Sequence, residues 1–178
     1  MMTPPQKQHE WLRRFVGEWT SEFECVMGPD QPAMKSKGRE VVRMVGDLWV
    51  VFEGEGEMPG GGTMTSILTL GFDPAKGKFV GSWIGSPMAT MFVYQGEFTR
   101  GGGNWGGGPA SGDVPGSADV QVLPLNTVGP SWADPTKQAN YQDVIELHGP
   151  NKRLLWSQAQ GDDGAWTRFM TGTFTRVK

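Results

Sequence analysis

The chain is poor in the residues that build metal and redox centres. Among its 178 residues there is one cysteine, Cys25, and there are two histidines, His9 and His148. One cysteine excludes an internal disulfide and a multi-cysteine metal site, so we interpret Cys25 as a small buried hydrophobe. No apolar run reaches the roughly 20 residues that span a bilayer, and the start lacks a signal-peptide pattern. We therefore expect a cytoplasmic protein with no membrane partner.

The chain also has no excess of basic charge. Its formal net charge is −3, which disfavours nucleic-acid partners because these require Lys and Arg to displace counterions. Four basic residues do share one face of a predicted strand, and a solvated outer face is favoured over a phosphate site. They are Lys35, Lys37, Arg39 and Arg43.

Recognisable catalytic motifs are missing as well. There is no Gly-x-Ser-x-Gly, and the glycine-rich stretch lacks the Gly-Lys-Ser/Thr of a phosphate loop. We expect no catalytic residue set, no metal and no resident cofactor. One alternative is haem held by His148, which is the only histidine on a predicted strand.

What the chain has in abundance is glycine (27), proline (13), tryptophan (8) and phenylalanine (9). Helical spacing of apolar residues predicts one short helix over 6–16. After it, alternation of apolar and polar residues predicts about ten strands separated by turn residues. The predicted strands cover 18–27, 34–45, 48–58, 64–72, 78–85, 88–99, 118–128, 140–148, 153–160 and 166–177.

These elements predict an all-β fold: a single antiparallel up-and-down β-barrel with one short N-terminal helix, in one domain over 1–178. Closure into a barrel would remove the exposed edges of so long a sheet. The stretch 100–117 is low in complexity and is expected to be a loop. It could be a flap over the barrel mouth, but an insertion tolerated in a surface hairpin is favoured.

The run Gly17-Glu18-Trp19 opens the first predicted strand and resembles the Gly-x-Trp motif of the calycin superfamily, which includes lipocalins. The resemblance implies that Trp19 plugs the closed end of the barrel and that Arg168 or Arg176 packs across it. Further blocks are similar to a bacterial family called domain of unknown function 1579. They include Leu70-Gly71-Phe72-Asp73-Pro74 and Trp166-Thr167-Arg168-Phe169, within a resemblance covering roughly 9–176. This implies a lipocalin-like barrel without an assigned activity.

Charged residues on apolar faces are the clearest candidates for a ligand site. Asp143 shares a strand face with Tyr141, and Arg168 shares one with Met170. If both faces point inward, the two charges could pair with each other, or Arg168 could hold the carboxylate of an apolar acid. Trp83, Trp156 and Met91 are further candidates for lining a cavity.

A last pattern concerns the acidic residues Glu53, Glu55 and Glu57, which we expect on a solvated outer face. Gly54 and Gly56 would then point inward and leave room for a ligand.

The sequence therefore favours a protein that binds a small, largely apolar molecule inside the barrel. The alternatives are an enzyme that uses Asp143 and Arg168, and a structural or interaction protein; a homodimer is also possible.

Overall fold

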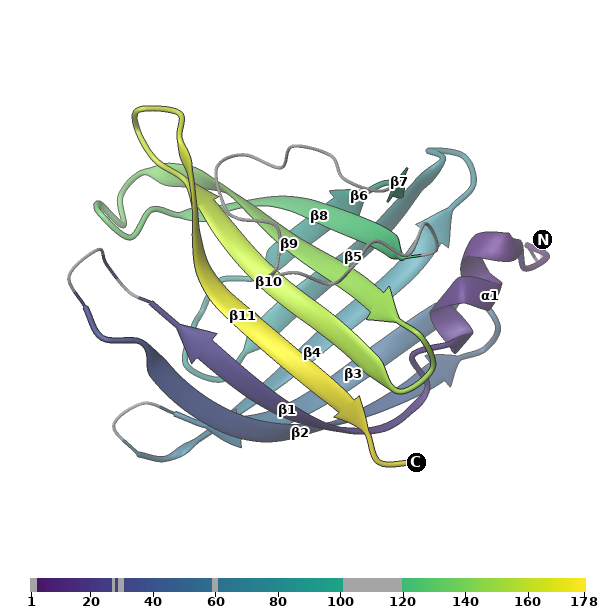
Figure 1. Cartoon of the computed structure of the whole chain (residues 1–178). Coiled ribbons are helices and arrows are strands. Elements are labelled where there is room, and N and C mark those ends of the chain that lie inside the picture. The colour runs from purple at the N-terminus through teal and green to yellow at the C-terminus, as the bar shows by residue number, and fades with distance from the viewer. Residues whose placement is uncertain (1–2, 27, 29–30, 59–60, 101–119) are drawn as a thin grey trace.

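The computed structural model describes residues 3–26, 28, 31–58, 61–100 and 120–178. One helix, α1 (Lys7–Arg13), precedes the strands (Figure 1). The strands are β1 (Gly17–Cys25), β2 (Met34–Val45), β3 (Trp49–Glu57), β4 (Thr63–Asp73), β5 (Lys78–Gly85), β6 (Phe92–Gly96), β7 (Thr99–Arg100), β8 (Gln121–Pro130), β9 (Gln138–His148), β10 (Lys152–Gln160) and β11 (Trp166–Arg176).

The strands in the described residues form one closed antiparallel sheet. From β1 to β6, and again from β7 to β11, each strand pairs with the next in sequence. Pairing of β1 with β11 and of β6 with β8 closes the circle. Because β6 and β7 pair with successive stretches of β8, they act as one interrupted strand, and the barrel has ten. The predicted all-β, up-and-down barrel is confirmed.

The interruption between β6 and β7 divides what the sequence predicts as a single strand over 88–99. Phe98 lies in the gap, where its ring packs edge-on against Trp11 at 4.8 Å and Phe79 at 4.7 Å. Leaving the ladder for two residues lets this aromatic side chain join the core under α1. Pro124 of β8, which has no backbone N–H to donate, lies beside the same gap, between the β6 and β7 pairing positions.

Helix α1 closes one end of the barrel, but it is shorter than the predicted 6–16. It begins after Gln6, whose backbone N–H donates to Nδ1 of His9 at 2.9 Å. Beyond Arg13, successive i→i+3 hydrogen bonds tighten the chain into turns, and Phe15 stays fully buried. His9 is also buried, and its ring caps the start of the helix through its hydrogen bond with Gln6. Within the described residues, no helix is long and apolar enough to cross a membrane.

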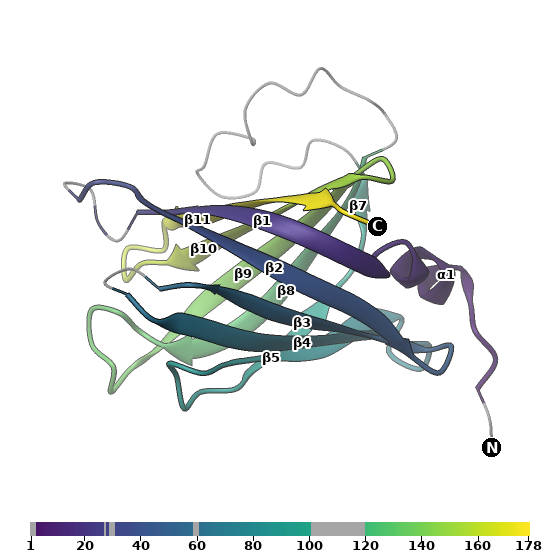
Figure 2. The same ribbon diagram turned by 90° about the horizontal axis from the view of Figure 1, so that it is seen from below.

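Trp19 forms the plug of this closed end. It is 1 % exposed, and its indole N–H donates to the carbonyl of Phe15 at 2.8 Å. The arginine that packs across it is Arg176, whose guanidinium carbon lies 4.2 Å from the ring centroid. Arg176 also donates to the carbonyls of Arg14 (2.6 Å), Val16 (2.5 Å) and Pro150 (2.7 Å). Figure 2 shows the C-terminus beside α1, and Arg176 acts as a clamp that ties the last strand to the segment between α1 and β1.

The outer face of β1 to β3 is charged and solvated, as expected. Its four basic residues pair with neighbouring carboxylates: Lys35 with Glu24 (3.7 Å), Lys37 with Glu22 (3.6 Å), Arg39 with Glu55 (3.2 Å) and Arg43 with Glu53 (3.0 Å). Exposed pairs of this kind add little to the free energy of unfolding. Most of the glycine-rich stretch predicted as a loop, 101–117, lies outside the described residues.

Candidate functional site

The barrel interior has a filled half and an accessible half. Near α1 the inward side chains, such as Val50, Phe52 and Leu70, are at most 1 % exposed. Toward the opposite end, inward side chains become only half-buried, as at Leu68 of β4 and Trp83 of β5. Solvent therefore reaches the interior through the end that α1 does not cover, which we call the open end.

Asp143 of β9 is a half-buried carboxyl group on the inward face of the barrel. Two hydroxyl groups donate to its carboxylate: Tyr94 to Oδ2 and Ser157 to Oδ1, both at 2.5 Å. Ser157 is the register partner of Asp143 on β10. Tyr94 comes from β6 and spans the intervening strand β8 to reach it. Three strands thus converge on one carboxylate.

Burial sets the electrostatics of this cluster. It raises the pKa of Asp143 above its ordinary value, while the hydrogen bonds from Ser157 and then Tyr94 oppose the shift. The pKa of Tyr94 is also raised, first by burial and then by the negative charge of Asp143. Tyr94 therefore stays a hydroxyl donor at any physiological pH.

Thr127 adds a polar group without a partner to the same inner wall. It faces inward on β8 opposite Tyr141, and it is 7 % exposed. Its hydroxyl has no hydrogen-bond partner among the described residues. A buried hydroxyl without a partner is unusual, because leaving it unsatisfied costs free energy.

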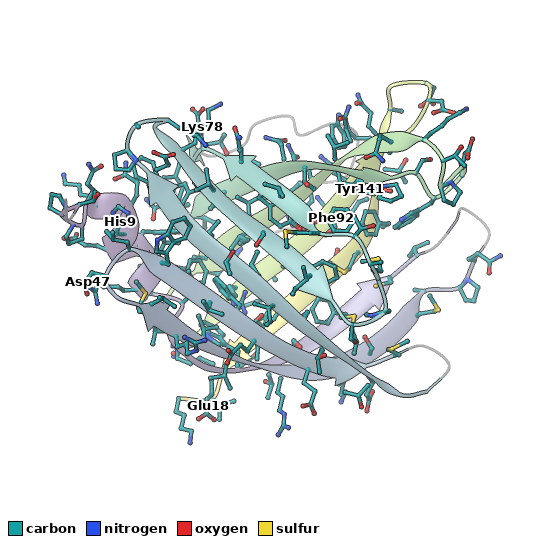
Figure 3. All side chains as sticks on the ribbon, turned by 180° about the vertical axis from the view of Figure 1, so that it is seen from behind. His9, Glu18, Asp47, Lys78, Phe92 and Tyr141 are labelled. Atoms are coloured by element: carbon teal, nitrogen blue, oxygen red, sulfur yellow. The ribbon has the colours of Figure 1, made fainter. Side chains whose placement is uncertain are left out.

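An aromatic cluster lines the open end. Phe92 lies 5.9 Å from both Trp83 and Tyr141, measured between ring centroids. Figure 3 shows Phe92 and Tyr141 near each other at the end of the barrel opposite His9. Phe169 stacks edge-on against Trp132 at 4.3 Å and against Tyr141 at 6.3 Å, which extends the cluster to the rim.

Two glycines provide the space in which these rings lie. A Cβ atom at Gly129 would overlap the Phe92 ring, and one at Gly85 would overlap the indole of Trp83. Both rings therefore occupy space next to the backbone that a side chain would otherwise fill.

The other inward charges form a closed pair deeper in the barrel. Arg153 of β10 is 1 % exposed and makes a salt bridge with Glu40 of β2. Its guanidinium carbon lies 3.8 Å from the ring centroid of Phe174 and 5.1 Å from that of Trp19. Burial, and then the charge of Arg176, lowers the pKa of Arg153, and the carboxylate of Glu40 balances the charge that remains.

Two sequence candidates do not lie in the interior, and the proposed pairing of Asp143 with Arg168 is wrong. The guanidinium carbon of Arg168 lies on the outer face, 3.9 Å from the ring centroid of Trp156. Trp156 is buried there, and its indole N–H donates to Glu146 at 2.7 Å. Because Trp156 precedes the inward Ser157 on β10, the two must face opposite sides of the sheet.

A β-bulge in β11 explains the misplacement of Arg168. Met170 pairs with Ser157, but the next pair is Arg168 with Gln158, so Phe169 is an extra residue. The bulge reverses the alternation, and Arg168 lies on the face opposite to Met170. The enzyme alternative requires Arg168 to bind an anionic group beside Asp143. Arg168 cannot do so from the outer face.

The remaining candidates lie as follows. Trp83 and Tyr141 line the open end, as expected, whereas Met91 is 58 % exposed in the connection between β5 and β6. His148 lies on the outer face, where Nε2 bonds Glu146 at 2.9 Å, so a haem ligand pointing into the barrel is excluded at this residue. Cys25 faces inward and is half-buried, and burial, then Glu24, raises the pKa of its thiol.

A groove of about 990 Å³ lies outside the barrel, over β1 to β5. An apolar row crosses its floor, because Val41, Ile67 and Ile84 occupy neighbouring register positions around Glu53. Each of these three side chains is 40–47 % exposed. The groove is thus separate from the interior cluster, and its floor is an exposed apolar row.

The residues that sequence reasoning missed are Tyr94, Ser157, Thr127, Phe92 and Phe169. The first four lie at inward positions of predicted strands, so the alternation contained a signal for their face. What it lacked was the register that brings Tyr94 and Ser157 to the same carboxylate.

Comparisons with known proteins agree with this fold. The crystal structure of Rv2717c from M. tuberculosis is similar with a TM-score of 0.67 and 11 % identity, covering 98 % of this chain and 100 % of that one. The S-type phycobiliprotein lyase CPES from Guillardia theta is similar with a TM-score of 0.57 and 13 % identity, covering 98 % and 99 %. Identities this low establish a shared fold alone. No curated protein matches the sequence.

The family comparison is more direct than the structural one. The family described as Protein of unknown function (DUF1579) matches residues 4–176, which is nearly the whole chain. The protein is therefore a member of the DUF1579 family, with a lipocalin-like β-barrel fold.

Proposed function

We propose that the protein binds a small, largely apolar molecule inside its barrel and admits it through the open end. The observation that carries the proposal is the contrast within the interior. Inward side chains near α1 such as Phe52 and Leu70 are fully buried, whereas Trp83 and Phe92 toward the open end are half-buried, as is Asp143 with its buried partners Tyr94 and Ser157. An apolar wall with a few convergent polar groups is the usual composition of a ligand site.

The residues we assign to this site are Trp83, Tyr141 and Asp143, together with Tyr94, Ser157 and Phe92. Burial of the ligand against the aromatic side chains would supply most of the binding free energy. The polar cluster would fix its orientation. Met91 contributes at most to the rim, and Trp156 and Arg168 have no part in it, because they lie on the outer face.

The proposal is tested with N-phenyl-1-naphthylamine, an uncharged dye whose fluorescence rises in apolar surroundings. Leu68→Trp adds bulk inside the barrel, beside Trp83 in the register, whereas Ile67→Trp adds the same group to the outer groove. We expect Leu68→Trp to weaken dye binding about tenfold or more, equivalent to about 1.4 kcal/mol. Ile67→Trp should leave it nearly unchanged.

The converse result, weakening by Ile67→Trp alone, would place the binding site in the outer groove. If native mass spectrometry with lipids, fatty acids and haem detected no bound species, and the dye also failed to bind, the proposal would be rejected.

The outer groove favours a second candidate, self-association. Its apolar row is flanked by residues of both charge signs, such as Arg39 and Glu55. A surface that carries both signs can be complementary to itself, which a two-fold dimer interface requires. Sedimentation equilibrium of the wild type and of Ile67→Asp tests this candidate. A dimer that the substitution dissociates supports it, and a monomeric wild type rejects it.

A further inference from the structure

The charges of the inner wall are unequal, and this restricts the ligand. The described strands place three acidic or basic side chains on the inner wall of the barrel: Glu40, Asp143 and Arg153. The cation, Arg153, is already in contact with Glu40, so these two charges cancel. Asp143 is left as a carboxylate whose hydrogen-bond partners are both neutral hydroxyl groups.

Cations that could hold an anionic ligand are directed elsewhere. Arg168 lies on the outer face over Trp156. Arg176 donates three hydrogen bonds to the carbonyl groups of Arg14, Val16 and Pro150 at the closed end. The inner wall formed by the described residues therefore offers no free cation to a carboxylate or phosphate.

Asp143 still has capacity to accept hydrogen bonds. An ionised carboxylate has about four acceptor positions, and Tyr94 and Ser157 occupy one on each oxygen. Their hydroxyl hydrogens also fix the orientation of the group. The residue is on the inward face and only half-buried, so part of its surface is exposed to solvent. The unpartnered hydroxyl of Thr127 on the adjacent strand is a further polar group on this wall.

We propose that the ligand is a protonated amine on an apolar skeleton, with its ammonium group bound by Asp143 and its apolar part against the aromatic wall. This inference rests on the proposed function and adds the charge of the ligand to it. An ammonium ion would supply the missing positive charge and donate to the open positions of the carboxylate. Hydrogen bonds that involve a charged group are about twice as strong as neutral ones.

The test compares the affinities of three ligands that share the same alkyl chain and differ in the charge of the head group. Binding is measured by isothermal titration calorimetry at neutral pH and at submicellar concentration. Dodecylamine is cationic, dodecanol neutral and dodecanoate anionic. We expect dodecylamine to bind roughly tenfold or more tightly than dodecanol, and dodecanoate to bind most weakly, because its carboxylate would repel Asp143. Equal or tighter binding of dodecanoate would overturn the proposal.

Substitutions then locate the effect at one residue. Asp143→Asn removes the negative charge and nearly keeps the shape, so it should abolish the preference for dodecylamine over dodecanol. Glu22→Gln removes the same charge from the outer face of β1, where Glu22 pairs with Lys37, and should leave the preference intact. A preference that survives in Asp143→Asn would overturn the assignment. The ligand comparison in the wild type is decisive even if this variant does not fold.

Failure of this inference differs from failure of the proposed function. If dodecanol and the uncharged dye bind but no amine preference appears, the barrel binds apolar molecules and the charge assignment is wrong. If neither the dye nor any of the three dodecyl ligands binds, the proposed function itself is wrong.

Discussion

Replacing Glu40 by Gln leaves Arg153 buried without its counter-charge. Arg153 is 1 % exposed and lies among aromatic rings in the closed half of the barrel, where water cannot solvate it. Removing one partner of a buried ion pair costs about 3–5 kcal/mol, because the remaining charge is uncompensated. A domain of this size has a free energy of unfolding of about 5–15 kcal/mol, so the loss is large.

Urea unfolding followed by tryptophan fluorescence measures this loss, with two comparisons. Glu55→Gln breaks the exposed pair with Arg39 and should change the free energy of unfolding by about 1 kcal/mol or less. Adding Arg153→Met to Glu40→Gln should restore most of the stability, because the buried charge is then gone. If Glu40→Gln destabilises no more than Glu55→Gln, the description of the closed half is wrong.

Three further predictions follow from the polar cluster and the plug. The folded-state pKa of Asp143 is raised, so its contribution to stability is full only below the unfolded value of about 3.9 and is lost as pH rises through the folded value. Asp143→Asn, which mimics the protonated form, should therefore unfold at higher urea than wild type at pH 7, with the difference vanishing in acid; lower stability at both pH values contradicts this. Tyr94→Phe removes a hydrogen bond that lowers the pKa of Asp143, so carboxyl NMR should show that pKa rising further, and a fall would refute the assigned contact. Arg176→Lys cannot keep three carbonyl contacts and the stack on Trp19, and should lower the unfolding free energy by about 1–2 kcal/mol; no loss would mean that the clamp is unimportant.

The closed end of the barrel could be predicted from the sequence because its signals are local. Gly17-Glu18-Trp19 marks the plug, and apolar spacing marks the helix that covers it. The outer face of β2 and β3 could also be predicted from the sequence. In a strand with one solvent-exposed face, charged and apolar residues alternate, and this alternation distinguishes the two faces.

Alternation failed where both faces of a strand are buried or where the register shifts. In β10 both Trp156 and Ser157 are buried, so the pattern alone cannot tell which faces inward. In β11 the bulge at Phe169 changes the side on which Arg168 lies, and no residue type there signals an extra position. The contact between Tyr94 and Asp143 joins strands that are not adjacent, and only the closed barrel brings them together.

The most direct test of binding inside the barrel is a crystal structure of the protein grown with dodecylamine. We expect the alkyl chain inside the barrel, in contact with Trp83 and Phe92, and the nitrogen within hydrogen-bond distance of a carboxylate oxygen of Asp143. An alkyl chain lying in the outer groove over Val41 and Ile67, with an empty interior, would contradict this expectation.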